Sequence, residues 1–288
     1  MNIIKETRLG VKTYGKAIYP TKDAILVLSF GTTYEHTKKV TIDSIVQDIQ
    51  HRYADTKVVL AFSSRIIVKR LRQKGIDILS PEEALDQLQA EGYTRVVMVS
   101  LDIIPGIEYT YKMALLEAYK QAFTQITLST PLLYWMGQSA CRDDVKLFIE
   151  ALGSQFLSYS DKTAILLMAH GTNHPANAYY AVIQAKLDEL TNRPVFIYSI
   201  EGWPELQDII PKLVKLKITD IALMPMMLVA GDHAHNDMAG ENEGSHLHLL
   251  KAAGFTVHTY MHGLGENAAI RKLFVEHTVE AVKDGGEI

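Results

Sequence analysis

Four side chains that can bind a metal or accept a proton stand just behind apolar runs of the sequence. They are Glu108, His170, Glu201 and His233, each directly after such a run or in its first loop. Two imidazoles and a carboxylate suit a borderline divalent metal such as Co²⁺, Ni²⁺, Zn²⁺ or Fe²⁺. Their wide separation in the chain is typical of a cleft site and unlike the tight spacing of a structural zinc motif. Any one of them alone would be read as a polar residue that caps or hydrogen-bonds at a strand end. Their shared position favours a common site.

The stretch 221–238 shows how such a residue is placed. It begins as a nearly continuous apolar run, typical of a strand buried on both faces of a parallel sheet. The run breaks at Gly231, and polar residues with ligand atoms follow at 232–237. Ligands of open α/β sheets bind just beyond the carboxyl ends of the strands. We therefore expect His233 at the mouth of a cleft and His235 on an exposed surface loop.

Apolar runs of strand length alternate with segments of helix length from about residue 24 onward. This alternation predicts an α/β fold with a doubly wound, mainly parallel sheet. One helix start is well marked, because Ser80 can cap, Pro81 suits the first helical position and Glu83 completes a capping box. Strands are predicted at 24–30, 57–62, 95–101, 126–128, 163–169, 195–199, 221–227 and 256–261, and helices near 35–52, 65–72, from 81, and near 108–121, 140–156, 176–190, from 203, 245–253 and 266–282.

The two halves of the chain look like copies of one unit. Residues 29–32 align with 169–172, and 106–108 align with 231–233, in the same order relative to the strands. Short matches of this kind are common between unrelated α/β segments, but order, type and position agree together here. We therefore predict an N-terminal extension over 1–22, one lobe over 23–138 and a second over 139–288, each lobe with a mainly parallel four-stranded sheet flanked by helices. The boundary between the lobes is approximate, and terminal helices can cross over it. A cleft between the lobes would be lined by strand ends from both.

Composition limits the classes of function. Hydrophobic residues make up 48% and charged residues 22%, as in an ordinary globular protein, and the net charge is −4. We therefore expect neither nucleic acid nor an acidic membrane surface as a partner. A single cysteine, Cys141, excludes an internal disulfide and a metal site built from several cysteines. We find no apolar leader at the N-terminus and no apolar run long enough to span a bilayer, so we expect a cytoplasmic protein.

The remaining motifs support no other chemistry strongly. The turns at 31–33 and 171–173 precede helices and can bind an anion there, but they lack the spacing of nucleotide-binding loops. The basic segment 65–72, with Arg65 at its start, is most simply a solvated face, and it can hold substrate carboxylates if it borders the cleft. Gly202 would let a large flat ligand approach the backbone. No nucleophile elbow is present.

The residues resemble those of the class II tetrapyrrole chelatases, in particular the anaerobic sirohydrochlorin cobaltochelatases of cobalamin synthesis. The run from Met227 to Met238 is the most specific segment, whereas the turn at Gly31 alone would not be specific. The resemblance extends from about residue 24 to the C-terminus. The extension before it and His235 are departures from the pattern. The segments that carry the resemblance are 26–33, 100–109, 168–171, 201–205, 223–238 and 263–267.

The resemblance implies two similar lobes like those of ferrochelatase and an ATP-independent lyase that inserts Co²⁺ into sirohydrochlorin. It implies His170 and His233 as metal ligands and proton acceptors, Glu201 as the third ligand and Glu108 as an acidic residue on the metal path. Substrate contacts are expected at Phe30, Gly31, Thr32, Arg65, Gly202 and Trp203. No organic cofactor is expected, and Co²⁺ is a substrate that Fe²⁺, Ni²⁺ or Zn²⁺ can replace in related enzymes. The oligomeric state stays open, with a homo-oligomer among the alternatives.

Two other functions remain open from the sequence. A two-lobed protein that holds a metal or a haem-like ligand without turnover would use the same residues. A hydrolytic metalloenzyme is disfavoured, because no dense metal motif is present. For a chelatase, a neutral imidazole can first ligate the metal and then take a proton, since the ordinary pKa of histidine lies near ~6.5. A tight cleft can also pucker the macrocycle at a cost of ~1–5 kcal/mol drawn from remote binding.

Overall fold

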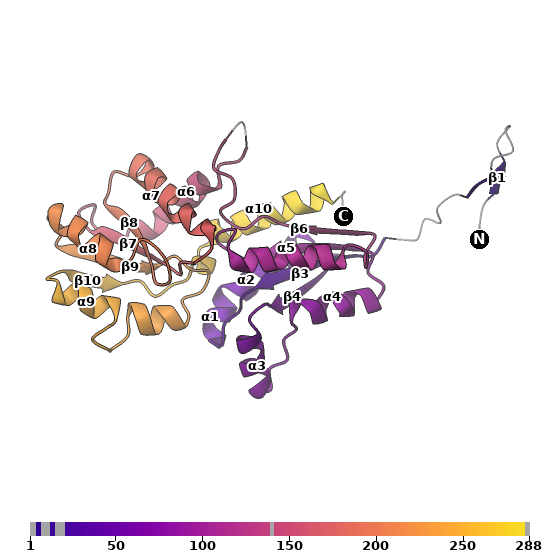
Figure 1. Cartoon of the computed structure of the whole chain (residues 1–288), viewed down its shortest axis with the longest axis horizontal. Coiled ribbons are helices and arrows are strands. Elements are labelled where there is room, and N and C mark those ends of the chain that lie inside the picture. The colour runs from indigo at the N-terminus through magenta and orange to yellow at the C-terminus, as the bar shows by residue number, and fades with distance from the viewer. Residues whose placement is uncertain (1–3, 7–11, 15–20, 139–140, 286–288) are drawn as a thin grey trace.

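The computed structural model describes residues 4–6, 12–14, 21–138 and 141–285. Its two lobes are each built on a four-stranded parallel sheet (Figure 1). The strand orders are β4-β3-β5-β6 and β10-β9-β7-β8. The predicted two-lobed α/β fold with parallel sheets is therefore confirmed. The strands are β3 (Asp23–Ser29), β4 (Lys57–Phe62), β5 (Arg95–Ser100), β6 (Gln125–Leu128), β7 (Ala164–Ala169), β8 (Val195–Ser199), β9 (Asp220–Pro225) and β10 (Thr256–Thr259).

The two sheets have the same topology. In each, the first strand of the half lies between the second and the third, and the fourth lies beyond the third. The turns that follow the two first strands also match, because Gly31 and Gly171 have φ values of +96° and +85°. That left-handed conformation favours glycine strongly. These agreements support the internal duplication inferred from the sequence.

Strand β3 shows why the apolar runs form buried strands. Ala24, Leu26 and Leu28 point to one face and pack in a core that includes α4 (Pro81–Ala90), whereas Ile25 and Val27 point to the other face. Side chains alternate between the two faces of a strand, so a strand covered on both faces must be apolar throughout. The core that holds Ile25 and Val27 also holds residues of β7 and β9. The lobes therefore share one continuous core.

The last helix, α10 (Ala268–Asp284), crosses from the C-terminal half onto the N-terminal lobe (Figure 1). It packs against α2, β5, β6 and α6, and Arg271 Nε donates to Asp48 Oδ2 of α2 at 2.7 Å. The predicted lobe boundary after residue 138 adjoins residues 139–140, which lie outside the described residues, and it stays a prediction. Within the described part of the chain, no helix is both long and apolar enough to cross a membrane.

The helix predicted over 35–52 is divided in two. Thr41 lies outside the helical region, with φ −118° and ψ −81°, and its hydroxyl donates to Thr37 O at 2.5 Å. Gly265 packs against it, since a Cβ built on Gly265 would lie 2.7 Å from Thr41 Cβ. The break therefore coincides with a local hydroxyl bond and with close packing of a residue distant in sequence. The helices are α1 (Glu35–Val40), α2 (Ile42–Arg52), α3 (Arg65–Gln73), α4, α5 (Ile107–Tyr119), α6 (Asp144–Phe156), α7 (Ala178–Leu190), α8 (Leu206–Lys215), α9 (His246–Ala252) and α10, with short turns η1 (Pro175–Asn177), η2 (Ala234–Met238) and η3 (Leu264–Glu266).

Two other segments differ from the sequence prediction. The stretch behind Gly231 is not a loop, because η2 forms a π-helical turn there. Within the predicted extension, β1 (Ile4–Glu6) and β2 (Lys12–Tyr14) pair as antiparallel strands, although no regular structure was expected. The rest of the extension up to residue 20 lies outside the described residues. The division at residue 22 remains a prediction, and β3 begins at Asp23.

Candidate metal-binding active site

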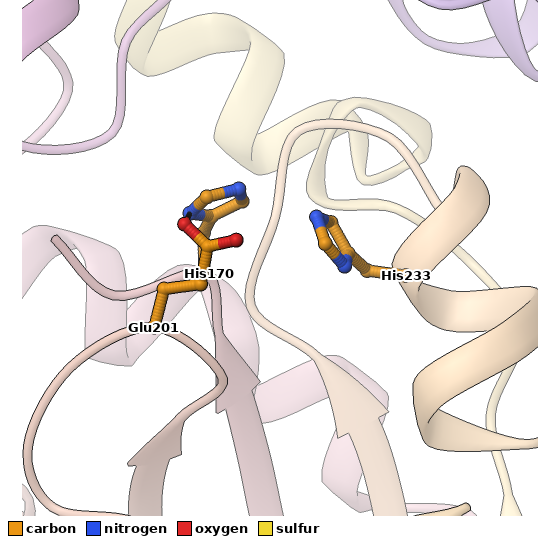
Figure 2. Close-up of side chains that lie close together, drawn as sticks. All are labelled: His170, Glu201 and His233. Carbon is orange, nitrogen blue, oxygen red and sulfur yellow. Dashed lines mark ion pairs between the residues drawn. The ribbon is translucent and has the colours of Figure 1, made fainter.

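The three predicted metal ligands lie together at the carboxyl edge of the C-terminal sheet. His170 follows β7, Glu201 follows β8 and His233 follows β9, and these strands are neighbours in the order β9-β7-β8. One ligand atom from each residue lies within 4.8 Å of those of the other two. Figure 2 shows the His170 ring and the Glu201 carboxyl side by side, with His233 facing them from the helical turn. The imidazole rings are 4.8 Å apart and nearly perpendicular, at 87°.

A close contact between two loops holds His170 beside Glu201. The Glu201 amide donates to the His170 carbonyl at 2.8 Å. A Cβ built on Gly171 would lie 2.6 Å from the Glu201 carbonyl carbon, so only glycine allows this approach. His170 Nδ1 then lies 3.9 Å from Glu201 Oε2 and 3.1 Å from the carbonyl oxygen of Gly171. The glycine turn thus sets the spacing of these two side chains.

His233 is oriented by a residue that the sequence reading did not single out. Its Nδ1 lies 2.6 Å from Oδ2 of Asp237, one turn further along η2. With the carboxylate as acceptor, Nδ1 carries the hydrogen and Nε2 keeps its lone pair. Asp237 was missed because 232–237 was predicted as a loop. The i, i+4 spacing of His233 and Asp237 would have identified the pair had the segment been read as helical.

The site is open to solvent. The exposed fractions of the side chains are 48% for His170, 62% for Glu201 and 32% for His233. Three protein ligands leave at least one coordination position for a further group, as in catalytic metal sites. An ion held here is therefore accessible to a second ligand. Such access is what transfer of a metal to another molecule requires.

Glu108 does not join this cluster. It lies in the first turn of α5, and its Oε2 accepts a hydrogen bond from Ser63 Oγ at 2.7 Å. The repeat correctly aligned it with His233, since β5 and β9 occupy equivalent positions in the two sheets. The carboxylate nevertheless lies at the carboxyl edge of the N-terminal sheet. Its place on the metal path stays a prediction.

The two lobes touch beside the site. Tyr34, two residues beyond Thr32, donates its hydroxyl to Asp232 Oδ1 at 3.4 Å, and its ring stacks on His235 at 5.1 Å. Burial, and then the Asp232 carboxylate, raise the pKa of the Tyr34 phenol, so it stays a donor. His235 is exposed, as predicted, but it lies on η2 rather than on a loop. Thr32 is buried, with 5% of its surface exposed, and its Oγ1 would lie 3.7 Å from a Cβ built on Gly231.

The other predicted substrate contacts divide into two kinds. Phe30 and Trp203 are exposed at 49% and 63%, and both follow strand ends, so they can meet a flat ligand. Gly31 instead packs against the ring of Phe62, since a Cβ built on Gly31 would lie 2.5 Å from that ring. A Cβ built on Gly202 would lie 2.3 Å from Asn177 Oδ1, so the absence of a side chain serves loop packing there. The approach of a flat ligand to the Gly202 backbone stays a prediction.

Comparison with known proteins identifies the family. The family described as cobalt chelatase (CbiK) matches residues 23–283. The chain belongs to the cobalt chelatase family. It is 38% identical over 262 residues to the sirohydrochlorin cobaltochelatase of Salmonella typhimurium, covering 91% of this chain and 97% of that one. It is also 31% identical over 268 residues to the sirohydrochlorin cobaltochelatase CbiKC of Nitratidesulfovibrio vulgaris, covering 91% of each.

Solved structures support the fold of this cobalt chelatase family member. SirB from Bacillus subtilis, determined with Fe³⁺, has a TM-score of 0.61 at 13% identity, covering 92% of this chain and 98% of SirB. DR2241 from Deinococcus radiodurans, described as similar to chelatases, has a TM-score of 0.54 at 11% identity, covering 91% of this chain and 55% of that one. At such identities the likeness concerns the fold alone. The two-lobed chelatase architecture expected from the resemblance is therefore confirmed.

Proposed function

We propose that this protein is an ATP-independent chelatase that inserts Co²⁺ into sirohydrochlorin. Membership of the cobalt chelatase family and two relatives named for this reaction support the proposal. The structural observation that carries it is the convergence of His170, Glu201 and His233, with ligand atoms within 4.8 Å of one another. Two imidazoles and a carboxylate suit Co²⁺. The ion is a substrate here, and the tetrapyrrole is its acceptor.

The proposed roles follow from charge balance. Sirohydrochlorin loses its pyrrole N–H protons as the divalent ion enters, so the site must release a metal and accept protons. A neutral imidazole of His170 or His233 donates its lone pair to Co²⁺, and the same lone pair takes a proton once the ion has moved to the ring. Glu201 balances the charge of the ion. Asp237 keeps His233 in the tautomer that presents Nε2.

The macrocycle occupies the cleft at the carboxyl edges of the sheets. Phe30 and Trp203, both exposed behind strand ends, offer apolar surfaces to its faces. Glu108, on the opposite sheet edge, attracts the incoming cation and can receive a proton. Binding of the large substrate by these remote groups supplies the energy that puckers the ring, about 1–5 kcal/mol.

An optical assay tests this function directly. Purified protein is mixed with metal-free sirohydrochlorin and Co²⁺, and the shift of the absorption band is followed over time. His170→Ala and His233→Ala should each lose most of the insertion rate yet stay folded, because half-exposed cleft residues fill little core volume. His258→Ala is the matched control, since His258 is an exposed histidine on β10. It should keep the wild-type rate.

The same assay separates the alternatives. Binding of the tetrapyrrole or of the metal without insertion would favour the binding-protein interpretation and reject the chelatase. Parallel runs with Fe²⁺, Ni²⁺ and Zn²⁺ determine which ion is inserted fastest. Folded His170→Ala and His233→Ala proteins with near wild-type rates would remove both histidines from the mechanism.

A further inference from the structure

A hollow lies on the N-terminal lobe, and none of the three clustered residues lines it. Its volume is about 830 Å³, within the range of small-molecule sites. It lies between α3, α4 and α5. Its lining includes Ser63, Arg65, Lys69, Arg72, Glu82 and Tyr111. Nothing in the family assignment specifies a ligand for it.

This hollow begins at the carboxyl edge of the N-terminal sheet. Ser63, which lines it, follows β4 and donates to Glu108 at 2.7 Å. Phe62, also in the lining, packs against Gly31. The amide of the next residue, Ser64, donates to the Phe30 carbonyl at 3.3 Å. The hollow therefore adjoins the strand ends where the proposed substrate contacts lie.

The acidic groups in the lining are already engaged. Glu83 pairs with Arg72 and accepts the Ser80 amide at 2.7 Å. The hydrogen bond from Arg72, and then that from the backbone, lower the pKa of Glu83 to about 2. Glu82 accepts the Tyr111 hydroxyl at 2.8 Å. Both carboxylates therefore have donors of their own within the wall.

Two cations of the lining have no such partner. Arg65 and Lys69 are exposed, and among the described residues neither forms an ion pair at 4.0 Å or less. They are four residues apart on α3, so both side chains lie on the same face of the helix. The whole chain carries a net charge of −4, so attraction of an anion must be local. The face of α3 that carries Arg65 and Lys69 provides this local attraction.

We propose that this hollow binds rim carboxylates of the tetrapyrrole through Arg65 and Lys69. The inference rests on the proposed function. Sirohydrochlorin bears acetate and propionate groups around its ring, so a macrocycle centred in the cleft projects carboxylates toward the strand ends. The Arg65 guanidinium can bind a carboxylate through two parallel hydrogen bonds, and Lys69 adds a point charge. The hollow therefore favours binding of a polyanionic macrocycle over an uncharged one.

The test compares two double variants that lose the same charge. Arg65→Gln/Lys69→Gln should raise the KM for sirohydrochlorin about tenfold. Each ion pair between one of these cations and a substrate carboxylate is partly exposed and contributes only modestly to binding. The kcat and the KM for Co²⁺ should not change, because the metal ligands are intact. Arg70→Gln/Lys74→Gln removes two cations of the same segment that do not line the hollow. It should leave every parameter at the wild-type value.

A substrate-side measurement needs no variant to fold. Sirohydrochlorin with esterified carboxylates should bind the wild-type protein about tenfold more weakly than the free acid, measured by absorption or fluorescence titration without metal. The Arg65→Gln/Lys69→Gln protein should discriminate less between the two. Equal KM values for both double variants, or equal binding of ester and acid by the wild type, would overturn the inference. Loss of insertion by the wild-type protein itself would instead reject the proposed function.

Discussion

Replacing Asp237 by asparagine isolates the orientation of His233 from its presence. Asp237 Oδ2 lies 2.6 Å from His233 Nδ1, and the two side chains are exposed at 45% and 32%. Asparagine retains an oxygen acceptor of the same size but no charge, and its amide can turn a donor toward the ring instead. The imidazole then loses its charged acceptor and is free to present either nitrogen. Binding of Co²⁺ should weaken because Nε2 is aimed at the ion for a smaller fraction of the time.

The size of the effect follows from the exposure of the pair. Loss of a hydrogen-bonding partner behind a metal ligand typically costs 10- to 100-fold in affinity or activity. Because this pair is partly solvated, we expect the lower end, a rise of about tenfold in the KM for Co²⁺ at saturating sirohydrochlorin. Stability should fall by no more than about 1 kcal/mol, as for a surface ion pair. Initial rates of the absorption change and a urea titration measure the two quantities.

Glu241→Gln is the control, since Glu241 is an exposed carboxylate just behind η2. It should keep the wild-type KM values. Asp237→Ala removes the acceptor altogether and should exceed Asp237→Asn in effect. A wild-type KM for Co²⁺ in both Asp237 variants would refute the assignment of Asp237 as the orienting residue. A rise in the KM for sirohydrochlorin instead would show that the carboxylate acts on the macrocycle.

Three further changes probe other parts of the molecule. Glu108→Gln should lower turnover at limiting Co²⁺ without weakening tetrapyrrole binding, and unchanged kinetics there would count against a role in metal delivery. Gly171→Ala should displace Glu201 and slow insertion, because the new Cβ would lie 2.6 Å from the Glu201 carbonyl carbon. Gly254→Ala is the control, since Gly254 also has a positive φ but no atom near its missing Cβ. An equal effect of both changes on insertion would disprove the role of the contact between Gly171 and Glu201. Burial lowers the pKa of His277 below its ordinary 6.5, so the wild type should lose stability as the pH falls from about 6.5 to that lower pKa, because the unfolded chain binds the proton first. Denaturant titrations should show that the free energy of unfolding depends less on pH in His277→Gln than in the wild type. The same pH dependence in both proteins would rule out His277 as its source.

Much of the fold is readable from local pattern. Strands covered on both faces must be apolar throughout, and the predicted bounds of Val195–Ser199 agree with the structure. Likewise, Ser80, Pro81 and Glu83 form the expected capping box at the start of α4. These features depend on residues close together in sequence. The signals that mark them therefore lie in the local sequence.

A common site for Glu108, His170, Glu201 and His233 was predicted from their place behind strands, and all but Glu108 meet. Adjacent parallel strands bring such residues to one edge of a sheet, so pattern and topology suffice. Asp237 could not be found in this way, because Gly231 and the polar run behind it resemble a loop while the chain turns into η2. The break at Thr41 has no proline or glycine to mark it, and it coincides with close packing against Gly265, which is distant in sequence. A contact of that kind leaves no local mark in the sequence.

Helix α10 also has a consequence for biosynthesis. It is the last described helix, and it covers β5 and β6 of the first sheet and packs on α2. Chains emerge from the ribosome N-terminus first, and domains usually fold as they appear. Here the face of β5 and β6 that α10 covers stays open until that helix has been made. We therefore expect the nascent chain to expose an apolar surface for most of its synthesis and to depend on chaperones that hold unfolded chains. A chain whose translation stops before α10 should misfold.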